Sequence, residues 1–112
     1  MKLSECPVKS AIDVIGGKWK PLILFALKAG PMRYGELRRF VEGPSQKVFT
    51  EQLRQLESAG VISRDVLKSR EPHVQYRLSP YGETMRPMLT ALAEWGTQRR
   101  AETPPNDSRN SA

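Results

Sequence analysis

The residues that could carry covalent chemistry are few in this sequence of 112 residues. It holds one cysteine, Cys6, and one histidine, His73, with no glycine-rich phosphate loop and no carboxylate pair in a recognisable catalytic context. Cys6 and His73 could form a nucleophile–base pair, but the expected elements place them in different parts of the domain. One cysteine and one histidine are also too few for a four-ligand zinc site. We therefore expect neither an enzyme nor a bound metal or other cofactor.

Cys6 nevertheless has a position that can make a thiol reactive. It precedes Pro7, which suits the first turn of a helix, so the thiol would lie at the positive end of a helix dipole. Lys9 would favour the thiolate and Glu5 would oppose it. Because there is no second cysteine, the open reactions are an intersubunit disulfide, a mixed disulfide with a small thiol, or alkylation by a small electrophile. The alternative is an inert, structural cysteine.

Side chains that could recognise bases gather in residues 45–59. At 100° per residue, Phe49, Leu53 and Leu56 share one apolar face of a helix, and the opposite face is polar with nearly balanced charge. In the major groove, Gln can pair with adenine, Lys with guanine, and Thr can contact the thymine methyl group. The DNA-binding candidates in this segment are Ser45, Gln46, Lys47, Thr50, Glu51 and Arg54.

Three of these candidates have a second interpretation. Ser45 is first of all a helix cap, although its backbone amide could also contact a phosphate. Glu51 could accept a hydrogen bond from cytosine, or it could pair with Lys47 or Arg54 at helical spacing. Arg54 lies further along the helix and is expected to meet a phosphate or a neighbouring carboxylate.

Positive charge flanks this segment. The formal net charge is +6; residues 18–39 hold six basic residues and one acidic residue, and residues 62–78 hold four and two. A mixed-polarity helix between basic segments fits the division in which phosphate contacts position a protein and base contacts specify a sequence. A merely solvated basic surface is the alternative, and a lone loop histidine is more often a bystander. The candidate phosphate or minor-groove contacts are Arg33, Lys68, Arg70 and His73.

The elements that must position these residues follow from hydrophobic periodicity and from breakers. The first helix is expected from Pro7 to the Gly16-Gly17 pair, and a second, central helix over residues 19–29. Residues 32–34 could form a short strand, and residues 35–41 a third helix with Leu37 and either Phe40 or Val41 facing inward. The remaining expectations are a fourth helix capped by Ser45 and ended by Gly60, strands over residues 61–68 and 74–78 with Val74, Tyr76 and Leu78 on one face, and a last helix from Ser79-Pro80 to about Arg100 that Pro87 should kink or split.

This order predicts a mainly α fold with a small β-hairpin, the winged helix-turn-helix. Residues 1–100 would form one domain. Residues 101–112 hold two consecutive prolines and no large apolar side chain, which predicts a disordered tail. No apolar run approaches the ~20 residues that span a bilayer, and no export signal follows Met1, so we expect a cytoplasmic protein without membrane contact.

An apolar stripe on the last helix is too long for so small a core to cover. The stripe predicts a twofold homodimer, with two reading helices about one DNA turn (~34 Å) apart on a near-palindromic site. Trp19 and Trp95 are expected to pack in the core or at this interface. The stripe consists of Met85, Met88, Leu89, Leu92 and Trp95.

Short motifs recur along residues 5–96 in the order and spacing of one protein family. Together they resemble the HxlR family of bacterial winged-helix transcription regulators, which are related to MarR-type proteins. The sequence departs at Phe49, where an aliphatic residue is usual, and in the loop 70–73, which has one proline. The motifs are Cys6-Pro7-Val8, Ile15-Gly16-Gly17-Lys18-Trp19, Gly30-Pro31-Met32-Arg33-Tyr34-Gly35-Glu36-Leu37, Ser45-Gln46-Lys47-Val48-Phe49-Thr50-Glu51-Gln52-Leu53-Arg54-Gln55-Leu56-Glu57, Gly60-Val61-Ile62-Ser63-Arg64, Val74-Gln75-Tyr76-Arg77-Leu78-Ser79 and Glu94-Trp95-Gly96.

The resemblance implies a dimeric regulator of double-stranded DNA, with dimer contacts from the N-terminal helix (Val8 and Ile12) and from the C-terminal helix. It also implies that Cys6, in its Cys-Pro context, could sense quinones, aldehydes or oxidants. A hydrophobic effector could bind at the dimer interface. Repression is the expected outcome, because such a dimer has little surface for recruiting polymerase. The alternative function is a winged-helix module that binds protein or RNA.

Overall fold

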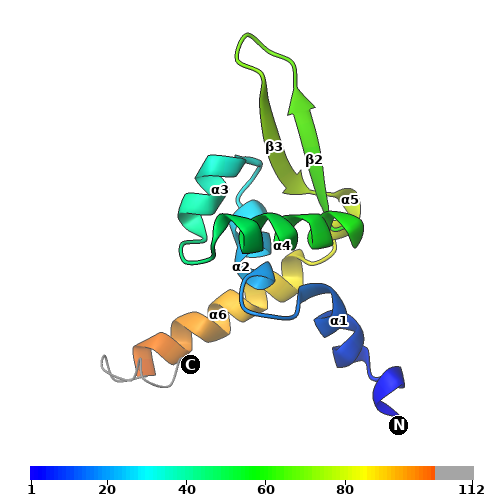
Figure 1. The fold of residues 1–112 in the computed structure, drawn as a ribbon. Coiled ribbons are helices and arrows are strands. Elements are labelled where there is room, and N and C mark those ends of the chain that lie inside the picture. The colour runs from blue at the N-terminus through cyan, green and yellow to red at the C-terminus, as the bar shows by residue number, and fades with distance from the viewer. Residues whose placement is uncertain (103–112) are drawn as a thin grey trace.

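The computed structural model describes residues 1–102 as helices around a small sheet (Figure 1). The hairpin of two long strands projects from one end of the molecule, and the first and last helices diverge from the other. None of the helices in the described part of the chain is long and apolar enough to cross a membrane. In chain order the elements are η1 (Leu3–Glu5), α1 (Pro7–Ile15), α2 (Lys20–Lys28), β1 (Met32–Arg33), α3 (Tyr34–Phe40), α4 (Gln46–Ser58), β2 (Ile62–Leu67), β3 (His73–Leu78), α5 (Pro80–Glu83) and α6 (Arg86–Glu102).

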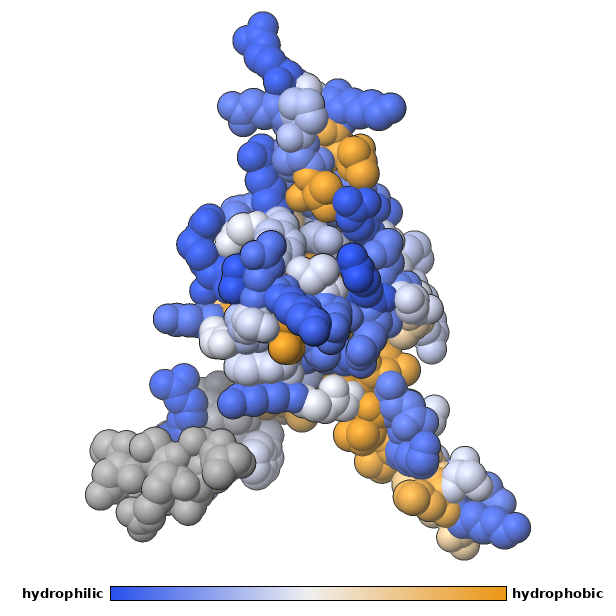
Figure 2. All heavy atoms as spheres, in the orientation of Figure 1, coloured by the Kyte–Doolittle hydropathy of each residue, from blue (hydrophilic) through white to orange (hydrophobic). Residues whose placement is uncertain are grey.

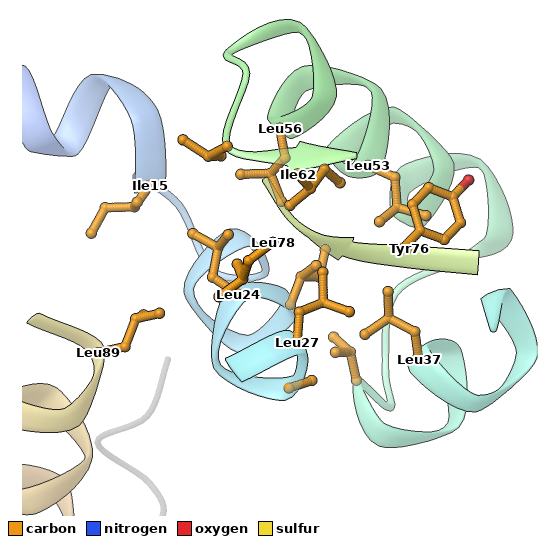
Figure 3. Packing of buried hydrophobic residues seen from close by; sticks show 14 of the residues in the cluster. Ile15, Leu24, Leu27, Leu37, Leu53, Leu56, Ile62, Tyr76, Leu78 and Leu89 are labelled. Atoms are coloured by element: carbon orange, nitrogen blue, oxygen red, sulfur yellow. The ribbon is translucent and has the colours of Figure 1, made fainter. Parts of the chain in front are cut away.

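Helix α2 is the centre of the core, as its composition predicts. It contacts α3, α4, α6 and β3, and Ile23, Leu24 and Leu27 are fully buried. Figure 3 shows Leu24 and Leu27 among buried side chains from α3, α4 and the sheet. Its burial is not complete all round, because Leu22 and Phe25 are exposed on the side that faces α6.

Helices α3 and α4 form the helix-turn-helix. The sequence did not decide whether Phe40 or Val41 faces inward at the end of α3. In the structure Val41 is buried and Phe40 is exposed. The turn into α4 depends on Gly43, whose φ of +130° is rarely adopted by other residues. A Cβ there would come within 2.9 Å of Cη2 of Trp19, so the Trp19 indole packs directly against this turn and leaves no room for a side chain. The prediction that Trp19 packs against the core is confirmed.

The hairpin of β2 and β3 is the wing. Together with β1 it forms a three-stranded antiparallel sheet in the order β1-β3-β2. The short strand β1 confirms the strand expected at residues 32–34, with Met32 opposite Tyr76 and Arg33 opposite Gln75. On β3, Tyr76 and Leu78 are buried and Val74 packs against the core, as alternation predicts.

The last helix is split, as expected from Pro87. Proline lacks an amide hydrogen, and Pro87 is the second residue of α6, where that donor is not needed. The break is held by Arg86, whose Nη1 donates to the carbonyl oxygen of Lys28 at 2.8 Å and whose guanidinium pairs with Glu83. Hydrogen bonds from Arg86 hold the pKa of the Glu83 carboxyl below its ordinary value.

Helix α6 also extends further than expected. Its last residue is Glu102, so Ala101 and Glu102 are helical and the helix ends two residues beyond the expected end at about Arg100. The rest of the expected tail, residues 103–112, lies outside the described residues.

The terminal helices carry apolar side chains that the chain itself leaves uncovered. On α6, Leu89 is buried, but Leu92 is 49% and Trp95 66% exposed. On α1, Val8 is 67% and Ile12 53% exposed, and Figure 2 shows hydrophobic side chains along this helix. The apolar stripe expected on the last helix is therefore covered near Met85 and Met88, which pack against the core, and open toward its end.

Candidate nucleic-acid interface

Helix α4 has one buried and one exposed face, in the register that the sequence predicts. Phe49, Leu53 and Leu56 are buried, and the Oγ of Ser45 accepts a hydrogen bond from the backbone N–H of Val48 at 3.1 Å. Ser45 is thus a helix cap. Because the cap fixes where the helix begins, it also fixes which side chains lie opposite the buried stripe. The exposed candidates are Ser45, Gln46, Lys47, Glu51 and Arg54.

Within residues 1–102, no ion pair includes any of the exposed candidates. Three ion pairs are formed in the part of the chain that the structure describes, namely Lys9–Asp13, Asp65–Arg77 and Glu83–Arg86. None of them includes Glu51, so the pairing of Glu51 with Lys47 or Arg54, one of its two expected interpretations, is not seen. The carboxylate and both cations remain available to another molecule.

Thr50 differs from the other candidates because its hydroxyl has a partner in the protein. The side chain is half-buried, and its Oγ1 lies 3.2 Å from the hydroxyl oxygen of Tyr34, with either group able to donate. The Tyr34 ring in turn meets Phe49 edge to face, with ring centroids 5.5 Å apart. Sequence reasoning missed Tyr34, since no local pattern signals a contact between residues 16 positions apart.

Basic side chains lie beside the start of α4. A cavity of about 430 Å³ is lined by α3 and the following turn, including Arg38 and Arg39. One guanidinium nitrogen of Arg38 lies 3.4 Å from the carbonyl oxygen of Pro44, the residue before the Ser45 cap. Sequence reasoning counted these arginines as flanking charge without giving either a role. Arg33 is exposed at the junction of β1 and α3.

The wing carries a second basic region, away from α4 (Figure 1). Lys68 and Arg70 are exposed in the hairpin loop, and Figure 2 shows hydrophilic side chains reaching out from this tip. His73 is less free: it is half-buried, and its Nδ1 lies 2.8 Å from the carbonyl oxygen of Glu71. Arg77 is held by Asp65 at 2.8 Å, which neutralises one of the cations of the wing.

Cys6 has the expected backbone position before α1. It is the residue before α1 and is half-buried, and its side chain makes no capping hydrogen bond. The ammonium group of Lys9, which was expected to favour the thiolate, pairs with Asp13 at 3.0 Å. Beside Pro7, a cavity of about 300 Å³ opens between α1 and the α5–α6 break, lined largely by apolar side chains such as Val14, Met85 and Met88.

Residues 1–102 contain no group of three or more His, Cys, Asp or Glu side chains placed to hold a metal ion. The arrangement instead offers a protruding polar helix face beside one basic region, with a second basic region on the wing. Such a surface is suited to hydrogen bonding along a grooved, negatively charged polymer.

Comparison with known proteins identifies the family. Residues 14–104 match the model of the HxlR-like helix-turn-helix family. The chain is 42% identical over 91 residues to the helix-turn-helix regulator YdeP of Bacillus subtilis, which covers 81% of this chain and 71% of YdeP. Its fold is similar to that of the redox regulator HypR in its oxidised form, with a TM-score of 0.78 and 39% identity over 83% of this chain and 96% of that one. A MarR-family regulator from Porphyromonas gingivalis gives a TM-score of 0.79 with 34% identity, over 87% and 95% of the two chains. The chain is a transcriptional regulator of the helix-turn-helix type and belongs to the HxlR family.

Proposed function

We propose that this regulator binds double-stranded DNA in a sequence-specific manner, as a homodimer on a near-palindromic operator, and represses transcription. The observation that carries the proposal is the exposed polar face of α4, which is fixed by its buried stripe and flanked by basic regions. A B-DNA major groove is about 12 Å wide and admits one α-helix. The 13 residues of α4 form a rod of roughly 20 Å, long enough to follow the groove across several base pairs.

Contacts to the bases and contacts to the DNA backbone would come from different parts of the fold. Gln46, Lys47 and Glu51 lie in the first turns of α4 and would reach base edges. Arg33, beside α3, would meet phosphate groups on the rim of the same groove. Lys68 and Arg70, on the wing, would meet the backbone or the adjacent minor groove.

Replacing one residue of each kind separates these roles. Lys47→Ala is expected to cost about 1–3 kcal/mol per half-site on the preferred duplex and to relax the preference at one base pair of each half-site. Arg70→Ala is expected to weaken binding to all duplexes alike and to lower the number of counterions released by about two per dimer, one for each protomer. Binding titrations on the preferred duplex, its single-base variants and an unrelated duplex measure both effects. A uniform loss for Lys47→Ala would contradict its role in base recognition.

The alternative function, a module for RNA or protein, gives a different result in the same assay. A duplex RNA of the same length and charge should compete poorly with the preferred DNA, because the deep, narrow groove of A-form RNA excludes a helix. RNA competing as well as DNA would favour the alternative.

The homodimer is supported by the apolar side chains that α1 and α6 leave exposed, Val8, Ile12, Leu92 and Trp95. Exposed apolar side chains on two helices at one end of a small domain are typical of an interface. Sedimentation at micromolar concentration is expected to give about twice the chain mass of 12.7 kDa. Trp95→Glu should weaken the dimer at least about 30-fold, as expected for a buried interface tryptophan.

The matched control is Phe40→Glu. Phe40 is a similarly exposed aromatic residue, but it lies on α3 rather than on either terminal helix. We expect this variant to remain a dimer. A monomeric wild-type protein, or a dimer that Trp95→Glu leaves intact, would contradict the assignment of the interface.

Regulation through Cys6 is the second part of the proposal. Its support is the half-buried, uncapped position of the thiol before α1 and the similarity of the chain to the redox regulator HypR. Oxidation of two Cys6 thiols in a dimer would transfer two electrons to the oxidant, release two protons and form an intersubunit disulfide. A mixed disulfide with a small thiol, or alkylation by an electrophile, would modify each Cys6 separately. An apolar effector would have the cavity between α1 and α6 available instead.

Treatment with diamide or a quinone is expected to change the affinity for the operator, and Cys6→Ser should abolish that change. The serine variant contains no thiol at all, so it is a complete control. Non-reducing electrophoresis and intact mass distinguish a disulfide from an adduct. An undiminished response of the Cys6→Ser protein would refute the sensing role.

A further inference from the structure

We propose that Tyr34 is a positioning residue for base recognition: its hydroxyl holds Thr50 so that the threonine methyl group, not its hydroxyl, faces the duplex and favours an A·T pair. This inference rests on the proposed function, because it assigns a preference to one position of the DNA-reading helix.

The first support is the contact itself, which joins two elements. Tyr34 is the first residue of α3, and its hydroxyl oxygen lies 3.2 Å from Oγ1 of Thr50, in the second turn of α4. The oxygen and the methyl group of a threonine are separate branches of the same carbon atom, so fixing the oxygen fixes the methyl group as well. A threonine with a free hydroxyl could rotate to present a donor, an acceptor or a methyl group to the DNA, and would therefore discriminate poorly between base pairs.

The second support is that Tyr34 is itself firmly placed. It follows β1, which pairs with β3, and its ring packs against the core and meets Phe49 edge to face at 76°. Phe49 precedes Thr50 on α4 and is fully buried. The Tyr34 ring is therefore held in one place by its neighbours, and its hydroxyl has a fixed position, as a positioning group requires.

Other helical threonines show what Thr50 would do without Tyr34. The hydroxyl of Thr97 donates to the carbonyl oxygen of Ala93 at 2.8 Å, one turn back on its own helix. Thr84, at the end of α5, donates to Tyr81 in the same manner at 2.6 Å. This is the usual local alternative for a helical threonine. At Thr50 the hydroxyl meets a different element instead, and its orientation is set by the tertiary structure.

The chemical consequence is a preference for thymine. In the major groove, thymine presents a methyl group where cytosine presents only hydrogen, and an apolar side-chain group recognises that difference. One methyl contact excluded from water favours the A·T pair about fourfold. Such a preference is small enough to be lost when the side chain can rotate.

The experiment compares, at each position of the operator, the affinity for A·T with the affinity for G·C. The preferred operator is first selected from a randomised duplex library with the wild-type protein. Affinities are then measured for this operator and for versions with A·T replaced by G·C, one base pair at a time. The ratio of two affinities cancels the active fraction of each protein, so a partly unfolded variant still gives a usable value.

In the wild-type protein, one symmetric position is expected to show an A·T preference of about fourfold that depends on Thr50. Thr50→Ser should remove this preference, since serine keeps the hydroxyl and lacks the methyl group. Tyr34→Phe should reduce it toward one while leaving the other positions unchanged. In a Thr50→Val background, Tyr34→Phe should have no further effect on the ratio, because both branches of valine are methyl groups.

Tyr81→Phe is the matched control, because Tyr81 is an exposed tyrosine on α5, outside the helix-turn-helix. It should leave every ratio unchanged. An unaltered preference in Tyr34→Phe, or an equal loss on all duplexes that would indicate a phosphate contact, would overturn the role of Tyr34 while leaving the proposed function standing. A wild-type protein that selects no sequence would overturn both.

Discussion

Raising the salt concentration from about 50 to about 200 mM is expected to weaken operator binding on the order of a thousandfold. Each protomer offers exposed cations at Arg33, Arg39, Lys68 and Arg70, so a dimer that meets about seven phosphates would release a similar number of counterions. The logarithm of the affinity should fall linearly with the logarithm of the salt concentration, and titrations at four or five salt concentrations give the slope.

A matched substitution shows whether this slope comes from the proposed surface. Lys9 is exposed but pairs with Asp13 on α1, at the end of the molecule opposite the wing. Lys9→Ala should leave the slope unchanged, whereas Arg33→Ala should reduce it by about two counterions per dimer, one for each protomer. A slope close to zero would exclude phosphate contacts. A slope that depends on Lys9 as strongly as on Arg33 would place the DNA on a different surface of the protein.

Replacing Gly82 with alanine is expected to lower the free energy of unfolding by about 3 kcal/mol, the upper range for overpacking a close-fitted site. A Cβ at Gly82 would overlap the carbonyl group of Val61, and both sides of the contact are backbone, so neither can yield by a side-chain rotation. The site is also fixed by Ser79, whose Oγ accepts from the Gly82 N–H and donates to the Gly60 carbonyl oxygen. The Gly82→Ala protein should melt roughly 10–20 °C lower.

The control for this substitution is Gly35→Ala. Gly35 is also helical, but a Cβ there would meet only a terminal nitrogen of Arg39, at an ordinary contact distance of 3.5 Å. Thermal unfolding by circular dichroism should show this variant unchanged or more stable by up to about 1 kcal/mol, the helix-propensity gain of alanine. If the two variants melt within about two degrees of each other, the close approach of α5 to Val61, the residue before β2, is not as the structure has it.

Features set by neighbouring residues could be predicted from the sequence. The starts of α1, α4 and α5 at Cys6-Pro7, Ser45 and Ser79-Pro80 are local, because a cap or an N-terminal proline acts within one turn. The break between α5 and α6, just before Pro87, has the same local origin. The buried stripe of α4 follows from its spacing alone, and it determines which polar side chains are exposed.

Contacts between distant residues could not be predicted in this way. The Tyr34–Thr50 hydrogen bond and the approach of Gly82 to Val61 each join elements whose mutual placement depends on the whole core.

The most direct test of the central claim, that the exposed face of α4 lies in the major groove, is a dimethyl sulfate footprint on the selected operator. This reagent methylates guanine at N7 in the major groove and adenine at N3 in the minor groove. The wild-type protein should protect guanine N7 in two half-sites about 10 base pairs apart, and Lys47→Ala should lose part of this protection in both. Protection confined to adenine N3, or an unchanged pattern in Lys47→Ala, would contradict this claim.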